Sequence, residues 1–466
     1  MEKVLFAGLD GLLGEADVGK RFDQERWGNL FLGGLRPYFE TLRDVYRYLA
    51  SFSFHVSLFQ STGSFEVNPL DLIALEVLRV FEPNVYHRLP EAKLELTNLR
   101  SHESDSHNEN ERTRKLIESI VNTASQPSQV KEIVTELFPS VEWVFNGPMY
   151  GHASREEWFR DLRICHSDVF DKYFQLAIPE GDISQAELDG ILSLVDNREG
   201  LVVELRALNE RGMLGVALDR LEAYKQKIDI RHAVPFITAL FDIGDELPDG
   251  RAGFYSISSD VRASRIIYWY LKQETNIDTR GAILKQATKA TTGLYLPVRI
   301  ASIESDEEKR RKDPNAFSVT DADLDALHRT CVDKVEQAAG SGLLVSHRNM
   351  LGILYCWDKW DSNEKPRQWV ERLVETKEGA LSFLVACLYR SLSHGMGDHV
   401  SQEHWRINLT NIEDFVPIDT LRRKVDVLSL DNLSEKERKA VKAFRKAVKR
   451  RQEGKSDDDW RDNEEE

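Results

Sequence analysis

Cysteine and long apolar runs are scarce in this sequence of 466 residues, and basic residues are fewer than acidic ones. The four cysteines are scattered and form no C-x-x-C pair, which excludes a disulfide framework and a cysteine zinc site and favours a reduced, cytoplasmic location. No apolar run approaches the roughly 20 residues that a membrane-spanning helix needs. The N-terminus lacks the basic start and small-residue cleavage site of a signal peptide, so nothing predicts a membrane target.

Acidic residues outnumber basic ones, and the formal net charge is −16. Because Lys and Arg supply most of the affinity for phosphate backbones, this balance argues against broad binding to nucleic acid, but a local basic site stays compatible with it. Hydrophobic residues make up 41% of the chain and charged residues 30%, as is typical of a globular protein. A chain of this length is expected to form about three domains.

Helical periodicity dominates the sequence. The clearest helix is predicted over 67–83, where Asn68 can cap the first turn, Pro69 suits the first helical position and Asp71 lies near the positive end of the helix dipole. A capping box at Ser184 predicts the start of another helix.

Strand signals are limited to 52–59 and 294–303. The first stretch alternates like a strand but also fits one helical face, and we assign it to a helix. The fold class is therefore predicted to be mainly α, with few or no strands: a multi-helix, lid-like bundle followed by larger helical domains.

Two polar, charge-rich stretches predict linkers between domains. The predicted organisation is a helical, lid-like region (1–100), a polar linker (101–115), a helical domain (116–303), a charged linker (304–318), a helical domain (319–432), a basic amphipathic helix (433–451) and a disordered acidic tail (452–466).

The basic helix predicted over 433–451 opens with a capping box of Ser434 and Glu437. Three apolar residues share one of its faces: Val441, Phe444 and Val448. Two hypotheses stay open. The helix is either docked on the protein surface ahead of a solubilising acidic tail, or it binds nucleic acid or an acidic partner.

Residues 14–21, GEADVGKR, contain the G-x-x-x-x-G-K pattern of a nucleotide-binding P-loop. However, Arg21 occupies the position of the hydroxyl that binds magnesium. Glu15 and Asp17 would add negative charge where phosphates lie, at a cost of roughly 4 kcal/mol per like-charge pair about 4 Å apart. We interpret the pattern as a chance match, and we predict no catalytic machinery, metal site or cofactor in this chain.

The stretch FEVNPLDLIALEVLRVFEPNVY resembles the E-V-N-x-x-D…E-x-h-R-x-F-E-P-x-h-Y block of KAP-family P-loop NTPases, which lies in the helical region after their ATPase core. The motif residues to which we assign a structural role are Glu66, Asn68, Pro69, Asp71, Glu76, Arg79, Glu82 and Pro83. An upstream segment matches the family's P-R-D-x-K-R-F-x-N pattern in part. It keeps Arg43, Asp44 and Arg47, but Leu42 replaces the proline and Ala50 the asparagine.

The resemblance implies a non-catalytic C-terminal helical region of a KAP-type NTPase, which acts as ATPase lid and as a partner- or effector-sensing part. The family's core is expected to precede residue 1 or to come from another chain, and ATP and magnesium are implied only for that core. Prokaryotic members imply a role in anti-phage defence, with other defence-system proteins as partners and an oligomer as a compatible state. The alternatives are a free-standing helical scaffold that binds another protein, and a nucleic-acid-associated module.

Arg43 and Arg47 lie one helical turn apart and share a face. In related ATPases a lid arginine reaches the terminal phosphates, so the resemblance implies a nucleotide-sensing role for this pair. The alternative is that both arginines pair with nearby acids such as Glu40, Asp44 or Glu76.

Two further patterns are interpreted as structural. The histidines His394, His399 and His404 are five residues apart, which is the wrong spacing for metal ligands on one helical face. Cys165 and His166 are adjacent, so their side chains point in different directions and do not suit a nucleophile and its base.

Overall fold

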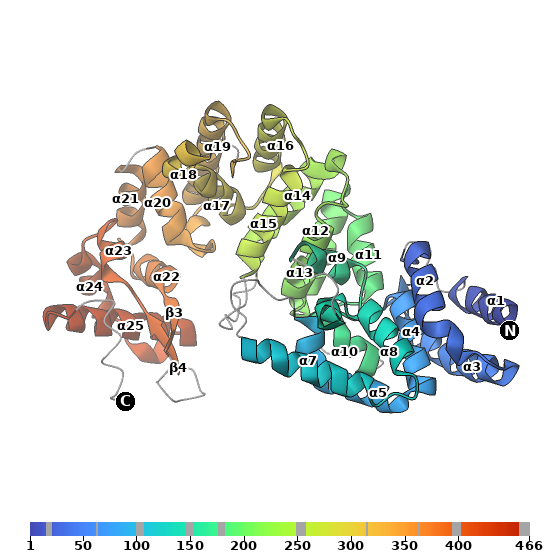
Figure 1. Cartoon of the computed structure of the whole chain (residues 1–466). Helices are drawn as coiled ribbons and strands as arrows, with labels where there is room; N and C mark the ends of the chain where they lie inside the picture. Colours follow the sequence, from blue (N-terminus) through green and yellow to red (C-terminus); the bar gives the residue numbers. More distant parts are fainter. Residues whose placement is uncertain are drawn as a thin grey trace. The chain divides into compact units, whose positions relative to one another are not determined.

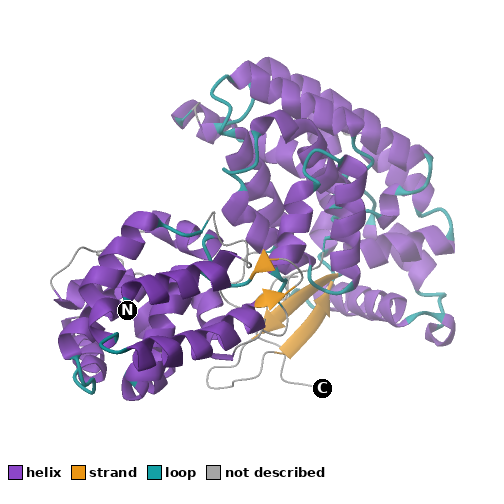
Figure 2. Ribbon diagram, turned by 90° about the vertical axis from the view of Figure 1, so that its right-hand side faces the viewer, coloured by secondary structure: helices purple, strands orange, loops and turns teal. Residues whose placement is uncertain are grey.

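The computed structural model describes residues 1–14, 21–61, 64–98, 107–145, 152–175, 182–247, 258–313, 316–361, 364–393 and 402–455. Over these residues the chain is almost entirely helical (Figure 2), which confirms the predicted mainly α fold. The strands form two antiparallel pairs, β1 (Gln60–Ser61) with β2 (Ser64–Phe65) and β3 (Tyr389–Ser393) with β4 (Gln402–Arg406). None of the described helices combines the length and apolarity needed to cross a bilayer.

The chain forms two compact units: unit 1 consists of 1–194 and 207–228, and unit 2 of 195–206 and 229–466. Figure 1 labels the helices and strands along the chain. The helices of unit 1 are α1 (Glu2–Gly14), α2 (Gln24–Leu30), α3 (Leu42–Phe59), α4 (Pro69–Phe81), α5 (Pro83–Arg88), α6 (Lys93–Thr97), α7 (His107–Val121), α8 (Pro127–Leu137), α9 (His152–Arg160), α10 (Ser167–Gln175), α11 (Gln185–Ser193) and α13 (Leu214–Tyr224). Helix α12 (Arg198–Glu210) begins in unit 2 and ends in unit 1.

Unit 2 contains the remaining helices, α14 (Ala233–Asp242), α15 (Ser259–Leu271), α16 (Ile277–Ala290), α17 (Tyr295–Glu304), α18 (Glu307–Lys312), α19 (Asp321–Gly340), α20 (Met350–Trp360), α21 (Glu364–Leu373), α22 (Lys377–Cys387), α23 (Leu409–Glu413), α24 (Ile418–Val425) and α25 (Glu435–Gln452). Shorter π or 3₁₀ segments lie at Phe31–Leu35, Arg36–Tyr38, Pro90–Ala92, Pro139–Phe145, Ile230–His232, Gly244–Glu246, Leu344–Ser346 and Leu430–Asn432.

Helix α4 lies at the centre of unit 1. Its first ten residues, 69–78, are all buried, and it contacts α3, α5 and α8. The side chain of Asn68 accepts hydrogen bonds from the backbone N–H groups of Leu70 and Asp71, and Pro69 occupies the first turn. The predicted start of this helix is therefore confirmed. A helix without a solvent-facing side must satisfy its polar side chains inside the protein.

The two stretches with strand signals are both helical. Residues 52–59 complete α3, as predicted, and residues 295–303 belong to α17. Pro297 lies in the first turn of α17, where the missing backbone N–H costs nothing. A run of apolar residues too short to show a period does not distinguish a buried helix from a strand.

The division into units differs from the predicted linkers at 101–115 and 304–318. Residues from 107 onward belong to α7, whose Ile117 and Ile120 enter the same core as Leu96 on the other side of the first predicted linker. Helical residues with a solvated face resemble a linker in composition, because only one side of such a helix needs apolar side chains.

The second predicted linker contains α18 and lies within unit 2. Arg310 attaches α18 to its neighbours: its Nε donates to the carbonyl of Glu304 at 2.8 Å, and its guanidinium stacks 4.7 Å from the ring of Phe317. One core contains both Ala301 and Cys331, from either side of this stretch.

Helix α25 begins at the predicted capping box of Ser434 and Glu437. Its apolar face is buried in unit 2, where Val441 and Phe444 are fully covered. This is the arrangement that the docked-helix hypothesis expects. The tail beyond Lys455 lies outside the described residues.

Candidate functional site

The residues of the KAP-like motif surround α4 and form a buried polar network. Asp71 is fully buried, yet its carboxylate accepts hydrogen bonds from Nε of Arg163 at 2.9 and 3.1 Å and from the backbone N–H of Ile164 at 2.8 Å. Arg26 of α2 also pairs with Asp71 and donates to Asn68 Oδ1 at 3.2 Å. Burial alone would lower the pKa of Arg163, but the charge of Asp71 raises it above its usual value.

Glu66 precedes α4 and binds the start of α11. Only 2% of Glu66 is exposed, and both its oxygens accept from the backbone N–H of Gln185, at 2.8 and 3.0 Å. The ammonium group of Lys172 lies 4.0 Å away. Burial raises the pKa of Glu66, although the hydrogen bond from Gln185 and nearby positive charges oppose the shift.

Glu76 lies on α4 opposite α3. Its carboxylate accepts from the hydroxyl of Ser51 and lies 3.1 Å from both His55 Nδ1 and Arg79 Nη1. Burial alone would raise the pKa of Glu76, but the hydrogen bonds from His55 and Ser51 and the charge of Arg79 lower it. Arg79 continues the network by donating to the hydroxyl of Tyr86 at 2.9 Å.

Glu82 joins α4 to α5 and binds the loop before α8. It accepts from the backbone N–H and hydroxyl of Ser125 at 2.8 and 2.7 Å, from the N–H of Gln126 at 2.9 Å and from the hydroxyl of Tyr38 at 3.0 Å. Pro83 then starts α5. Each motif acid therefore binds a different segment to α4 or to the residues beside it. The motif residues thus hold the fold of unit 1 together.

The two arginines assigned to nucleotide sensing lie on the exposed side of α3. Arg43 and Arg47 are both solvent-exposed, and within the described chain neither forms an ion pair with Glu40, Asp44 or Glu76. The guanidinium of Arg47 stacks 4.6 Å from the ring of Phe81, so Arg43 is the freer of the two.

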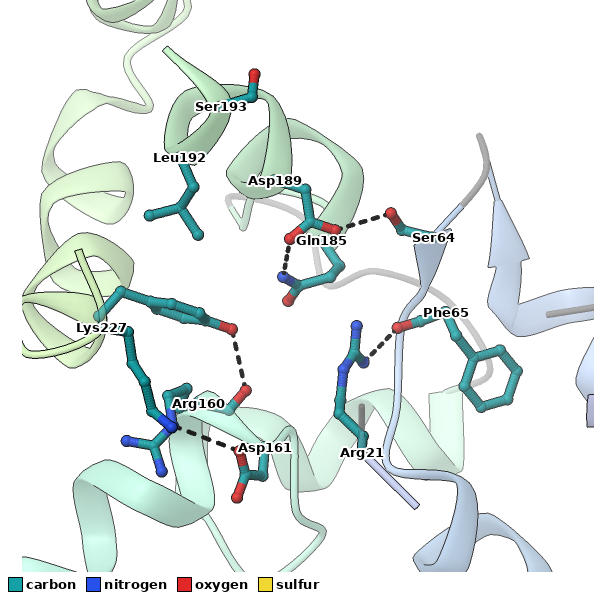
Figure 3. Close-up of a pocket in the computed structure, with 11 residues that line it drawn as sticks. Arg21, Ser64, Phe65, Arg160, Asp161, Gln185, Asp189, Leu192, Ser193 and Lys227 are labelled. Carbon is teal, nitrogen blue, oxygen red and sulfur yellow. Dashed lines mark hydrogen bonds and ion pairs between the residues drawn. The ribbon is translucent and has the colours of Figure 1, made fainter. Parts of the chain in front are cut away.

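The P-loop-like stretch is described only at its ends, since residues 15–20 lie outside the described chain. Gly14 is the last residue of α1. Arg21 donates to the backbone carbonyls of Phe65 at 2.6 Å and Val67 at 3.5 Å, just before α4. Its side chain thereby enters a cavity of about 610 Å³ in unit 1 (Figure 3).

The cavity has polar and apolar walls in similar measure and is open to solvent, and segments distant in sequence contribute its walls. Eleven residues line it: Arg21, Ser64, Phe65, Arg160, Asp161, Gln185, Asp189, Leu192, Ser193, Tyr224 and Lys227. The hydroxyl of Tyr224 donates to the carbonyl of Arg160 at 3.1 Å and so caps the end of α9. Arg21 and Lys227 lie on opposite sides of the space (Figure 3).

Sequence reasoning drew attention to only one of these residues, Arg21, and for a different reason. The other charged residues of the cavity (Arg160, Asp161, Asp189 and Lys227) carry no spacing signal, because they come from the ends of helices distant in sequence. A cavity can be predicted from sequence only when its polar residues lie close together in one motif, and these residues do not.

The histidine and cysteine patterns provide no site within the described chain. His394 and His399 lie outside the described residues, and His404 lies on β4. Burial raises the pKa of the Cys165 thiol to about 12 and lowers the pKa of His166 to about 4, so both groups are neutral at pH 7. Among the described residues, no group of three or more His, Cys, Asp and Glu side chains is placed to hold a metal ion.

Comparison with known proteins adds no relative: no family model, no curated protein and no solved structure matches this chain.

Proposed function

We propose that this chain is a non-catalytic helical region of a KAP-type P-loop NTPase system, which acts as lid and sensing part for an ATPase core supplied in cis or in trans. By the same resemblance, we propose that the system serves anti-phage defence. The four cysteines are free thiols, which supports a reducing, cytoplasmic location.

The observation that carries the proposal is the role of the motif residues. The resemblance rests on Glu66, Asp71, Glu76 and Glu82, and each of these buried carboxylates binds a segment outside α4. Shared packing residues indicate a shared fold, whereas a shared activity requires shared residues at the site of the chemistry. A likeness carried by packing residues therefore supports a shared lid-like architecture without shared catalysis.

The exposed arginines provide the point of contact with a nucleotide-bound core. An arginine that is always charged and not engaged by an acid is suited to bind phosphate oxygens bidentately. Arg43 meets this description, while Arg47 packs on Phe81.

Steady-state ATP turnover tests the proposal. The purified chain with Mg²⁺ and ATP is expected to show no turnover, and a P-loop NTPase core identified by copurification and mass spectrometry should be stimulated by it. Arg43→Gln should reduce that stimulation at least about tenfold, since an arginine that stabilises the transition state contributes more than this. Lys3→Gln, an exposed change on α1, should leave it unchanged. Magnesium-dependent turnover by the chain alone would refute the proposal.

A second candidate function, binding to nucleic acid, is favoured by the outer face of α25. Four cations recur there at helical spacing, all exposed: Arg438, Lys442, Lys446 and Lys449. Because the apolar face of the same helix is buried in unit 2, the four basic side chains are all directed away from the core of that unit.

A further inference from the structure

Two positive charges of the cavity in unit 1 form no ion pair with any described acid, although the charge of Arg21 acts on the nearby Glu66. Arg21 uses its guanidinium on the backbone carbonyls of Phe65 and Val67, and within the described chain it forms no ion pair. Lys227 is exposed at the opposite wall and likewise has no described acidic partner. A carbonyl carries only a partial charge, so it leaves most of the field of a guanidinium uncompensated.

The two acids of the cavity, in contrast, are already engaged. Asp189 accepts from the hydroxyl of Ser64 at 2.9 Å and from Nε2 of Gln185 at 2.9 Å. Asp161 lies 3.4 Å from Nε of Arg160, which neutralises it locally. Asp189 nevertheless keeps its charge, because both of its donors are neutral. The cations Arg21, Arg160 and Lys227 and the acids Asp161 and Asp189 therefore leave the cavity with one net positive charge.

Buried charges of both signs lie behind the cavity, since the charges of Arg21 and Arg220 both act on the buried carboxylate of Glu66. Arg220 lies one helical turn before Tyr224, is only 2% exposed, and stacks 4.9 Å from the ring of Phe159. Among the described residues, none of its guanidinium nitrogens has a hydrogen-bond partner. Burial raises the pKa of Tyr224, and the charges of Arg21 and Arg220 both oppose that rise, so both cations act at the cavity wall.

The cavity also presents an acceptor. Oε1 of Gln185 is buried and has no hydrogen-bond partner among the described residues, although Nε2 of the same amide is bound to Asp189. An unsatisfied buried carbonyl is costly, and a hydroxyl or N–H of a ligand would satisfy it. The hydroxyls of Ser64 and Ser193 already donate to Asp189 and to the carbonyl of Gly190, so each offers a ligand only an acceptor.

We propose that this cavity binds a small molecule that carries a phosphate group, held between Arg21 and Lys227. A phosphate monoester carries between one and a half and two negative charges at pH 7, so its oxygens can accept from both cations although Asp189 opposes its binding. The volume of about 610 Å³ suits a ligand of metabolite size. This inference is independent of the proposed NTPase relationship, because it rests only on the residues of unit 1.

Isothermal titration of the full-length chain tests the proposal with three probes: inorganic phosphate, adenosine monophosphate, and adenosine as the uncharged counterpart. Phosphate or the monophosphate should bind saturably and adenosine should not. Tighter binding of the monophosphate assigns an ester as the ligand, and equal binding assigns free phosphate. Arg21→Gln and Lys227→Gln should each weaken the affinity at least about tenfold, as expected for a lost charge-assisted hydrogen bond.

Asp189→Asn should change the affinity in the opposite direction to Arg21→Gln and Lys227→Gln. It removes a negative charge from the wall while keeping an oxygen that accepts from Ser64, so affinity should rise about twofold to threefold. Lys3→Gln, on the exposed side of α1, is the matched control for loss of a cation. Circular dichroism and thermal unfolding establish that each variant is folded. Three outcomes would each overturn the proposal: equal affinities of wild type and Arg21→Gln, adenosine binding as tight as that of its monophosphate, or weaker binding in Asp189→Asn.

Discussion

Single carboxylates organise unit 1. Moving an ionised carboxylate from water into a protein interior costs several kcal/mol unless hydrogen bonds and opposite charge replace the lost water. Two arginines and a backbone N–H replace the water around Asp71. Two backbone N–H groups and two hydroxyls replace the water around Glu82. Because the partners come from distant segments, each acid makes the position of one segment depend on that of another.

Asp71→Asn is expected to destabilise the protein by about 3 kcal/mol, because the largely buried Arg26 and Arg163 would then have only the partly exposed Glu136 as a counter-charge. Urea unfolding of the full-length chain, followed by tryptophan fluorescence, measures the loss. The exposed acid Asp10 on α1 offers the matched control, and Asp10→Asn should change stability by no more than about 0.5 kcal/mol. Equal unfolding midpoints for the two variants would contradict this account of Asp71.

Glu76 should make unfolding sensitive to acid. The pKa of Glu76 in the folded protein lies below its usual value of 4.5, so its stabilising contribution is complete above pH 4.5 and is lost as the pH falls through the folded value. The difference in unfolding free energy between wild type and Glu76→Gln should therefore be largest near pH 7 and shrink towards pH 3.

Glu66→Gln should show the opposite trend. Burial raises the pKa of Glu66 above 4.5, so the stability of the wild type relative to this variant should increase as the pH falls from 7 towards 4.5. Parallel pH profiles for the two variants would contradict the opposite shifts. Exposed Glu40→Gln provides a reference without burial.

At the residue scale, the sequence predicts local contacts and not distant ones. The cap at Asn68, the first-turn Pro69 and the box at Ser434 involve neighbours within three residues, and all are confirmed. Asp71 was predicted to favour the helix dipole, but its main partners, Arg26 and Arg163, are 45 and 92 residues away. A sequence pattern contains no information on which of many arginines will meet a given acid.

At the scale of elements, a polar face and a linker have the same composition. Helix α7 passes through a stretch predicted as a linker, because its apolar residues gather only towards its end, at Ile117, Ile120 and Val121. Helix α25 was recognised because its apolar face and its cap fall within one continuous pattern. Helices are thus predictable where cap and apolar stripe occur together.

The basic stripe of α25 has a testable consequence for binding to duplex DNA. Replacing Arg438, Lys442, Lys446 and Lys449 by Gln should weaken binding, and should make the slope of log affinity against log salt shallower by about 3 to 4, since each phosphate contact contributes about 0.9. Fluorescence anisotropy at several salt concentrations measures the slope.

The matched control for the stripe removes the same charge from dispersed exposed sites, with Gln in place of Lys3, Lys289, Lys377 and Arg423. This control should reduce the slope far less than the stripe variant does. Similar slopes for both variants would show that only net charge matters, and the absence of DNA binding by the wild type would remove nucleic acid as a second candidate function.

At the scale of the whole molecule, composition predicted about three domains in sequence order, whereas the chain forms two units that are each discontinuous. Residues 207–228 return to unit 1 after 195–206 have joined unit 2. Length and polarity cannot reveal such a return, because it depends on which apolar faces meet. Nor could they reveal the cavity of unit 1, to which the returning segment contributes Tyr224 and Lys227.

The contact between Glu66 and Gln185 has a consequence for biosynthesis. The two residues are 119 positions apart, and ribosomes add about 5 to 20 residues per second, so roughly 6 to 24 s separate their synthesis. During that interval the carboxylate of Glu66 lacks the backbone N–H of Gln185 that it binds in the folded protein. On ribosomes that pause before Gln185, unit 1 should therefore be incompletely folded. Chaperones and proteases should be able to bind it until the later segment emerges.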